Sequence, residues 1–97
     1  MKNYFVKLTL QIGECEKGTS TLVQAEDKAS ASKFALALEC HGNSTFEGDD
    51  LVWDMGGEMA YTIWGIEEVS DADLEVLKKF HNVFKFDQQT IDDILAD

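Results

Sequence analysis

The chain has 97 residues, of which 44% are hydrophobic, so we predict one compact domain that spans residues 1–97. Nineteen acidic residues against eight lysines give a net charge of −11, and the sequence contains neither arginine nor proline. This charge excludes electrostatic binding to a nucleic-acid backbone or to an anionic membrane, and no apolar run approaches the roughly 20 residues of a membrane span.

The two cysteines, Cys15 and Cys40, are too few to make a disulfide framework. No signal peptide is recognised among the first residues. We therefore expect both cysteines to be reduced thiols of a cytoplasmic protein.

Residues 4–25 are predicted to form a β-hairpin. Residues 4–12 alternate apolar and polar side chains, which is typical of a strand with one core face and one solvent face. Residues 13–18 read as a polar turn, and residues 19–25 as the second strand.

A helix is predicted after the hairpin. Asp27 is placed to cap its first turn, and the helix is expected to run to about His41, with Gly42 as the left-handed residue that ends it. Its buried stripe at helical spacing consists of Ala31, Phe34, Ala35 and Leu38.

The middle of the chain is predicted to form a second hairpin. Residues 43–50 are polar and typical of a loop, whereas residues 51–55 and 59–66 read as strands. Gly56 and Gly57 between them indicate a tight turn. Both faces of this hairpin carry apolar residues, so the periodicity leaves open which face belongs to the core.

Two shorter helices are predicted near the end. Ser70 and Asp73 match a capping box, and the helix that they begin is expected to run to about His81. Its predicted buried residues are Leu74, Leu77 and Phe80. Residues 83–86 read as a short link or strand, and Asp87 is placed to cap a last helix. The predicted inward residues of that helix are Ile91, Ile94 and Leu95.

These elements follow each other in the order ββα-ββα-α. We therefore predict an α+β fold, with an antiparallel sheet of three to four strands and two to three helices packed on one of its faces.

The charge is divided unevenly along the chain. Residues 1–44 hold five acids and five lysines and are neutral, whereas residues 45–97 hold 14 acids and three lysines and carry the whole excess. Such asymmetry indicates an electrostatic partner. The acidic part also contains Trp53, Tyr61 and Trp64, and disordered acidic tails lack such aromatic residues. We therefore predict a neutral scaffold half and a folded acidic half.

Glu39, Cys40 and His41 are adjacent and combine residue types that bind zinc or form a nucleophile with its base. A zinc site needs about four ligands at paired short spacings, and the other cysteine and histidine do not provide them. We interpret Cys40 as a small buried residue and His41 as a helix C-terminal residue that the helix dipole favours.

The acids around residue 50 also lack the spacing of a calcium loop. A catalyst that uses two carboxylates stays open as an alternative, but we predict no metal, no cofactor and no enzymatic activity.

Concentrated like charge destabilises a compact domain by self-repulsion. A solubility surface is one interpretation of the acids, and a surface that uses the field to bind a partner is the one we favour. The predicted partner-binding face consists of Glu47, Asp49, Asp50, Asp54, Glu58, Glu67, Glu68, Asp71, Asp73 and Glu75, with Asp87, Asp92 and Asp93 as further candidates. Carboxylates on a rigid surface resemble a phosphate backbone and can occupy a groove of lysines and arginines that normally holds DNA.

The whole chain, from Met-Lys-Asn-Tyr-Phe-Val-Lys-Leu-Thr-Leu to Ile-Asp-Asp-Ile-Leu-Ala-Asp, resembles small anti-CRISPR proteins encoded by phages and prophages. In length, acidity and lack of arginine it is similar to type I-F inhibitors of the DNA-mimic kind. Anti-CRISPR proteins share no common motif, so no functional residue is carried over.

This resemblance implies a phage protein that acts in the cytoplasm of the infected or lysogenic bacterial host. It implies binding to the type I-F CRISPR surveillance complex, at the basic DNA-docking site of the large subunit and adjacent backbone subunits, so that target DNA is excluded. Two alternatives stay open. One is an acidic interaction module or adaptor that binds a protein through Trp53 or Trp64, and the other is a small hydrolase with paired carboxylates.

Overall fold

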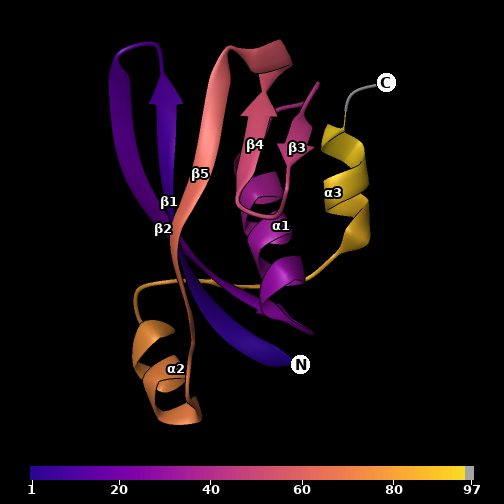
Figure 1. Ribbon diagram of the computed structural model, residues 1–97. Coiled ribbons are helices and arrows are strands. Elements are labelled where there is room, and N and C mark those ends of the chain that lie inside the picture. The colour runs from indigo at the N-terminus through magenta and orange to yellow at the C-terminus, as the bar shows by residue number, and fades with distance from the viewer. Residues whose placement is uncertain (96–97) are drawn as a thin grey trace.

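The computed structural model describes residues 1–95, and these residues fold into a six-stranded mixed sheet with three α-helices (Figure 1). The strands lie in the order β3-β4-β5-β1-β2-β6. The predicted α+β class is confirmed. The predicted number of three to four strands is wrong, and the sheet is not wholly antiparallel, because β6 pairs with β2 in parallel.

The first hairpin is longer than predicted. Strands β1 (Lys2–Ile12) and β2 (Cys15–Ala25) pair along their whole lengths, from Lys2 opposite Ala25 to Ile12 opposite Cys15. The turn is therefore two residues long, and Gly13 in it has a φ of 58°, a conformation that favours glycine. The polar residues after the turn form the exposed first part of β2. They pair with β1 through the backbone, which does not require apolar side chains.

Helix α1 (Lys28–Glu39) begins where it was predicted to begin. The side chain of Asp27 accepts a hydrogen bond from the Ser30 backbone N–H at 2.8 Å, which confirms the cap. The helix ends two residues early, because Cys40 is already extended at φ −76° and ψ 153°. The predicted stop at Gly42 is therefore wrong.

The middle segment contains three strands instead of two. Strand β3 (Thr45–Glu47) lies inside the predicted loop and pairs with β4 (Leu51–Asp54), which pairs with β5 (Met59–Glu68). The predicted two-glycine turn is a 3-10 turn, η1 (Met55–Gly57). β3 was not predicted because it is an edge strand of only three residues, and the first and last of them are exposed.

The C-terminal elements are shorter than predicted. Ser70 caps α2 (Asp71–Leu77) by accepting from the Asp73 backbone N–H at 3.2 Å, and the helix ends at Leu77 rather than near His81. Phe80 follows the helix and is 77% exposed, so its predicted burial is wrong.

Strand β6 (Val83–Lys85) and helix α3 (Gln88–Ile94) complete the chain. The Asp87 carboxylate caps α3 by accepting from the Gln89 backbone N–H at 3.1 Å. Ile91 and Ile94 are buried as predicted, whereas Leu95 is 40% exposed.

The main core lies between the sheet and helices α1 and α3, which contact each other (Figure 1). It takes alternate residues of β1, such as Val6 and Leu8, together with Phe34 of α1 and Ile91 of α3. The other face of the sheet stays open except at one end. There α2 and the turn after it cover Phe5, whose ring lies edge-on to His81 at 5.2 Å between centroids. The prediction that all helices lie on one face is therefore wrong for α2.

Candidate functional site

Nine of the ten residues predicted for the acidic face are exposed. Three lie at the turn between β3 and β4, one just before β5, two at the end of β5, and three in α2. In that order they are Glu47, Asp49 and Asp50; Glu58; Glu67 and Glu68; Asp71, Asp73 and Glu75. The tenth residue, Asp54, is completely buried and does not belong to the surface.

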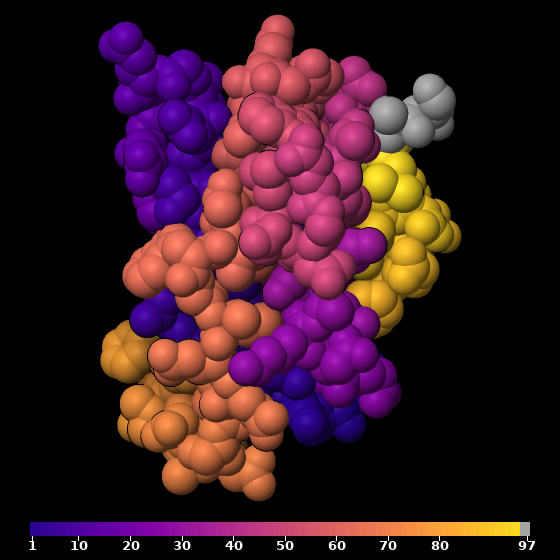
Figure 2. All heavy atoms as spheres, in the orientation of Figure 1, coloured from indigo at the N-terminus to yellow at the C-terminus, as the bar shows by residue number. Residues whose placement is uncertain are grey.

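The nine exposed acids follow the course of β5. Glu58 precedes the strand, and the turn that contains Asp50 lies beside its middle, where the Asp50 carbonyl accepts from the Ile63 N–H at 2.8 Å. Glu67 and Glu68 end the strand, and α2 continues beyond it. Figure 2 shows the segments from β3 to α2 running down the visible face from one end of the molecule to the other. We call these nine residues the acidic track.

Lysines neutralise little of this charge. Within residues 1–95, three acids of the track form ion pairs, and all three pairs are long and solvent-exposed. They join Lys2 to Glu68 at 3.8 Å, Lys33 to Asp49 at 4.0 Å and Lys78 to Glu75 at 3.6 Å. Exposed pairs of this kind contribute about 0–1 kcal/mol each. Most of the track is therefore available to an external partner.

The other acidic candidates are separate from the track. Asp87 caps α3, and the side-chain amides of Gln88 and Gln89 donate to Asp92 and Asp93 at 3.1 and 2.6 Å. In Figure 1, α3 lies beyond β3, on the side away from β5. These three acids therefore lie apart from β5 and α2, whereas Asp49 at the β3–β4 turn lines one hollow together with Gln88 of α3.

Asp54 has a structural role at the end of β4. Its two carboxylate oxygens accept from the backbone N–H groups of His41 and Gly42 at 3.0–3.2 Å and from Ser44 Oγ at 2.8 Å, and His41 Nδ1 lies at 2.9 Å. The carboxylate therefore holds the chain between α1 and β3 against the sheet. We call these interactions the Asp54 cage.

The protonation of Asp54 follows from this cage. Burial raises the pKa of the Asp54 carboxyl, but the hydrogen bonds from the side chains of His41 and Ser44 and from the backbone lower it further than burial raises it. The pKa therefore lies below its ordinary value of 3.8, and the side chain is a buried, fully bonded carboxylate at neutral pH.

The neighbouring thiol is not activated. Burial raises the pKa of Cys40 to about 12, whereas a nucleophilic or metal-binding cysteine needs a lowered pKa. Ser44 donates directly to Asp54 and not to an imidazole, which is not the arrangement of a serine nucleophile with its base. This cluster therefore organises a loop. Cys40 is half-buried rather than buried as predicted, and His41 lies beyond the end of α1 rather than in its last turn.

Among residues 1–95, no group of three or more His, Cys, Asp or Glu side chains is arranged to hold a metal ion. In the same part of the chain, no helix has the length and apolar character needed to cross a membrane.

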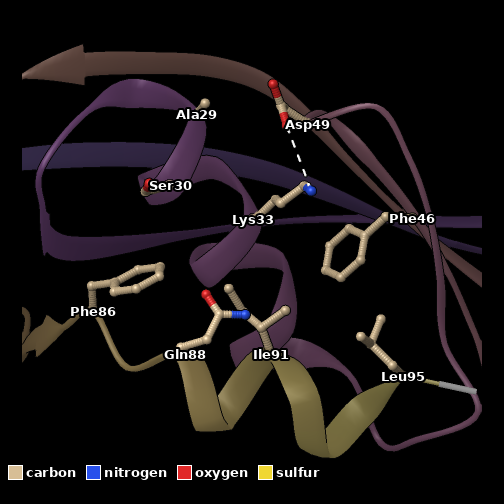
Figure 3. Close-up of a pocket in the computed structure, with 9 residues that line it drawn as sticks. All are labelled: Ala29, Ser30, Lys33, Phe46, Asp49, Phe86, Gln88, Ile91 and Leu95. Atoms are coloured by element: carbon tan, nitrogen blue, oxygen red, sulfur yellow. Dashed lines mark ion pairs between the residues drawn. The ribbon is translucent and has the colours of Figure 1, made fainter.

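A hollow of about 390 Å³, lined by both apolar and polar residues, lies between α1, α3 and β3 (Figure 3). Phe46, Phe86 and Ile91 point into it, and Lys33 crosses its upper side. The Lys33 ammonium lies 5.5 Å from the Phe46 ring centroid and reaches Asp49 at 4.0 Å, which Figure 3 marks as an ion pair. Lys33 thus weakens the charge of the track at Asp49.

The open face of the sheet carries exposed aromatic residues beside the track. Trp53 is 39% exposed and Trp64 is 65% exposed. The Lys7 ammonium lies over the Trp64 ring, 5.2 Å from its centroid. The sequence indicated both tryptophans as residues that could bind a partner protein. It did not indicate Phe5 and Val76, which also line this face. The alternation of residues 4–12 indicated the face of Phe5, but no local pattern indicated that α2 would lie against it.

Comparison of the chain with protein-family models, with curated proteins and with solved structures finds no match.

Proposed function

We propose that this protein binds the positively charged groove of a nucleic-acid-binding protein and thereby excludes the nucleic acid. The observation that carries the proposal is the acidic track, in which nine exposed carboxylates lie at the β3–β4 turn, at both ends of β5 and in α2. Its charge is fixed by folded elements, so binding requires little ordering of the carboxylates.

The type I-F CRISPR surveillance complex is the partner that we propose, because the sequence resembles DNA-mimic inhibitors of that complex. Its basic DNA-docking site, on the large subunit and adjacent backbone subunits, would receive the track in place of target DNA. Such binding occurs in the cytoplasm of the bacterial host and needs neither a cofactor nor catalysis.

The test measures competition with DNA. A purified type I-F surveillance complex is incubated with the protein, and binding of a fluorescent target duplex is followed by anisotropy between about 50 and about 200 mM salt. We expect the protein to reduce DNA binding, with an affinity for the complex that falls by about tenfold or more over this range. An affinity that barely changes with salt contradicts the mimic.

A matched pair of variants locates the surface. E47Q/D50N/E58Q/E67Q removes four charges of the track, none of which forms an ion pair within residues 1–95. E14Q/E16Q/D92N/D93N removes the same number of charges elsewhere. We expect the first variant to lose at least tenfold in affinity and the second less than threefold, as rough values for charges inside and outside an interface. Equal losses in both variants contradict a role for the track.

A second candidate function is apolar docking of a partner on the open sheet face. The exposure of Trp53 and Trp64 favours it, because aromatic residues are common anchors of interfaces. This function requires salt-insensitive binding that W53A or W64A reduces by about tenfold or more. Salt-sensitive binding that survives both substitutions excludes it.

A further inference from the structure

A groove lies on the open face of the sheet, where α2 packs beside β1 and the end of β5. Its volume is about 380 Å³. Its apolar lining includes Phe5, Val69 and Leu77, which are half-buried. Three carboxylates of the acidic track, Glu67, Glu68 and Asp73, line it too, and all three are exposed. We call this feature the α2 groove.

The α2 groove continues toward Trp64. A second hollow of about 310 Å³ shares Phe5 and Lys7 with it and is also lined by the Trp64 ring. Gly65 lies opposite Lys7 in the sheet, and a side chain there would meet the Lys7 Cδ at 3.4 Å. The Lys7 side chain thus lies over Gly65 and reaches toward Trp64.

The lining determines what kind of group fits. An apolar floor takes the methylene stem of a long side chain, and carboxylates at the rim take its cationic head. A planar guanidinium suits this place better than an ammonium, because it stacks on aromatic rings and binds carboxylates in a bidentate manner. Of the three carboxylates, only Glu68 forms an ion pair within residues 1–95, a long one with Lys2.

We propose that the α2 groove receives an arginine side chain of the partner protein, with its stem on Phe5 and Leu77 and its guanidinium at Glu67 and Asp73. This inference takes its partner from the proposed function, because a basic nucleic-acid groove presents arginines on its surface. One part of the acidic track then forms a pocket for a specific side chain, and the track as a whole adds a general electrostatic attraction.

Lys7 has a defined effect on this binding. It is the one lysine that lines the groove, and its ammonium rests over Trp64 at 5.2 Å from the ring centroid. A positive charge beside the groove repels an incoming guanidinium and competes with it for the aromatic surface. Removing this charge is therefore expected to strengthen arginine binding.

The test uses blocked peptides as probes. Gly-Gly-Arg-Gly-Gly, acetylated and amidated, is titrated into the full chain at low salt, and backbone amide shifts are followed by NMR. We expect saturable shifts concentrated at Phe5, Val69, Val76 and Leu77. The same peptide with citrulline, which is neutral and nearly isosteric with arginine, is expected to produce none. The lysine peptide is expected to bind several-fold more weakly.

Three variants test the residues directly. E67Q/D73N is expected to weaken the arginine peptide by about fivefold or more, whereas D92N/D93N removes equal charge from α3 and should change its affinity by less than about twofold. K7M is expected to strengthen binding by about twofold or more. Shifts spread evenly over all acidic regions, equal effects of the two double variants, or weaker binding to K7M would each overturn the assignment.

The outcomes separate this inference from the proposed function. If the protein blocks DNA binding by the surveillance complex and E67Q/D73N is as effective as D92N/D93N, the α2 groove is not an arginine pocket but the acidic track still acts. If the peptide binds as expected and DNA binding is not blocked, the groove is supported and the CRISPR partner is rejected.

Discussion

Asp54 and Glu67 are both acids of the charged half of the chain, and each lies in the last two residues of a strand, but their surroundings are opposite. Asp54 has no exposed surface and accepts four hydrogen bonds from backbone N–H groups and the Ser44 hydroxyl, with the His41 ring nitrogen beside it. Glu67 is exposed and forms no ion pair within residues 1–95.

This difference shows that acids of the same half of the chain lie in two different environments. A buried carboxylate is stable only when donors surround it, and it then ties several chain segments together. An exposed carboxylate without donors adds little to stability, but its field extends about 10 Å into the solvent at moderate salt. The Asp54 cage and the end of β5 should therefore respond differently to substitution.

The largest expected effect comes from removing the Asp54 carboxylate. D54A leaves the N–H groups of His41 and Gly42 and the Ser44 hydroxyl without an acceptor, at a cost of roughly 1–3 kcal/mol per buried group. We expect the free energy of unfolding to fall by about 3 kcal/mol or more in urea denaturation. The control is D49A, which removes an exposed acid from the track and should cost less than about 0.5 kcal/mol. Equal stabilities of the two variants would show that the cage is not structural.

A smaller effect is expected from S44A, which removes one buried donor of the cage. The loss of the 2.8 Å bond to Asp54 should cost about 1–2 kcal/mol. Local opening near Ser44 exposes Cys40, so alkylation of that thiol should become about tenfold faster for each 1.4 kcal/mol lost locally. Cys15, which is exposed at the start of β2, should react at an unchanged rate and serves as the internal control.

The pH dependence of stability gives a third comparison. Because the pKa of Asp54 is below 3.8 in the folded state, its contribution is fully present at higher pH and is lost as the pH falls through the folded pKa. We expect the unfolding free energy to decrease below about pH 4 and D54N to lack this part of the decrease. Hydrogen bonds from Ser30 also lower the pKa of Asp27. The D27N variant should therefore still show the part of the decrease in unfolding free energy that is due to Asp54. A wild-type profile that D54N leaves unaltered would contradict the cage.

The smallest expected effect concerns the exposed end of β5. E67Q/E68Q relieves repulsion between adjacent like charges and gives up only the 3.8 Å pair with Lys2. The unfolding free energy should change by less than about 0.5 kcal/mol. Denaturation of this variant beside wild type measures the change, and a loss of more than about 1 kcal/mol would show that these acids support the fold.

Local patterns were sufficient to predict several elements of the fold. The alternation in residues 4–12, the cap at Asp27 and the cap at Ser70 all led to elements that the structure contains. Each of these signals acts within a few residues of the chain, through strand geometry or a hydrogen bond to a nearby N–H.

The errors arose where distant segments decide the outcome. β3 exists because β4 offers it a pairing edge, and this short segment has no strong pattern of its own. Residues 83–86 were left open as a link or a strand, and pairing with β2 makes Val83–Lys85 a strand. Phe80 was predicted to be buried because helical spacing continued, but α2 ends at Leu77 and leaves it exposed.

The acidic surface was predicted as a group of residues but not as an arrangement. The composition of residues 45–97 was enough to indicate nine exposed acids, because carboxylates stay in water unless donors compensate their burial. It could not distinguish Asp54, since the donors of its cage come from His41, Gly42 and Ser44, ten or more positions earlier.

By itself, the sequence determined that the protein is an α+β domain with a neutral half and an acidic half, because composition, alternation and helix caps act locally. Only the tertiary structure decided that the β3–β4 turn brings its exposed acids beside β5, that Asp54 is removed from the exposed acids, and that α2 forms a groove with Phe5 and Glu67. Those facts depend on strand register and packing between segments far apart in the chain, which no local pattern specifies.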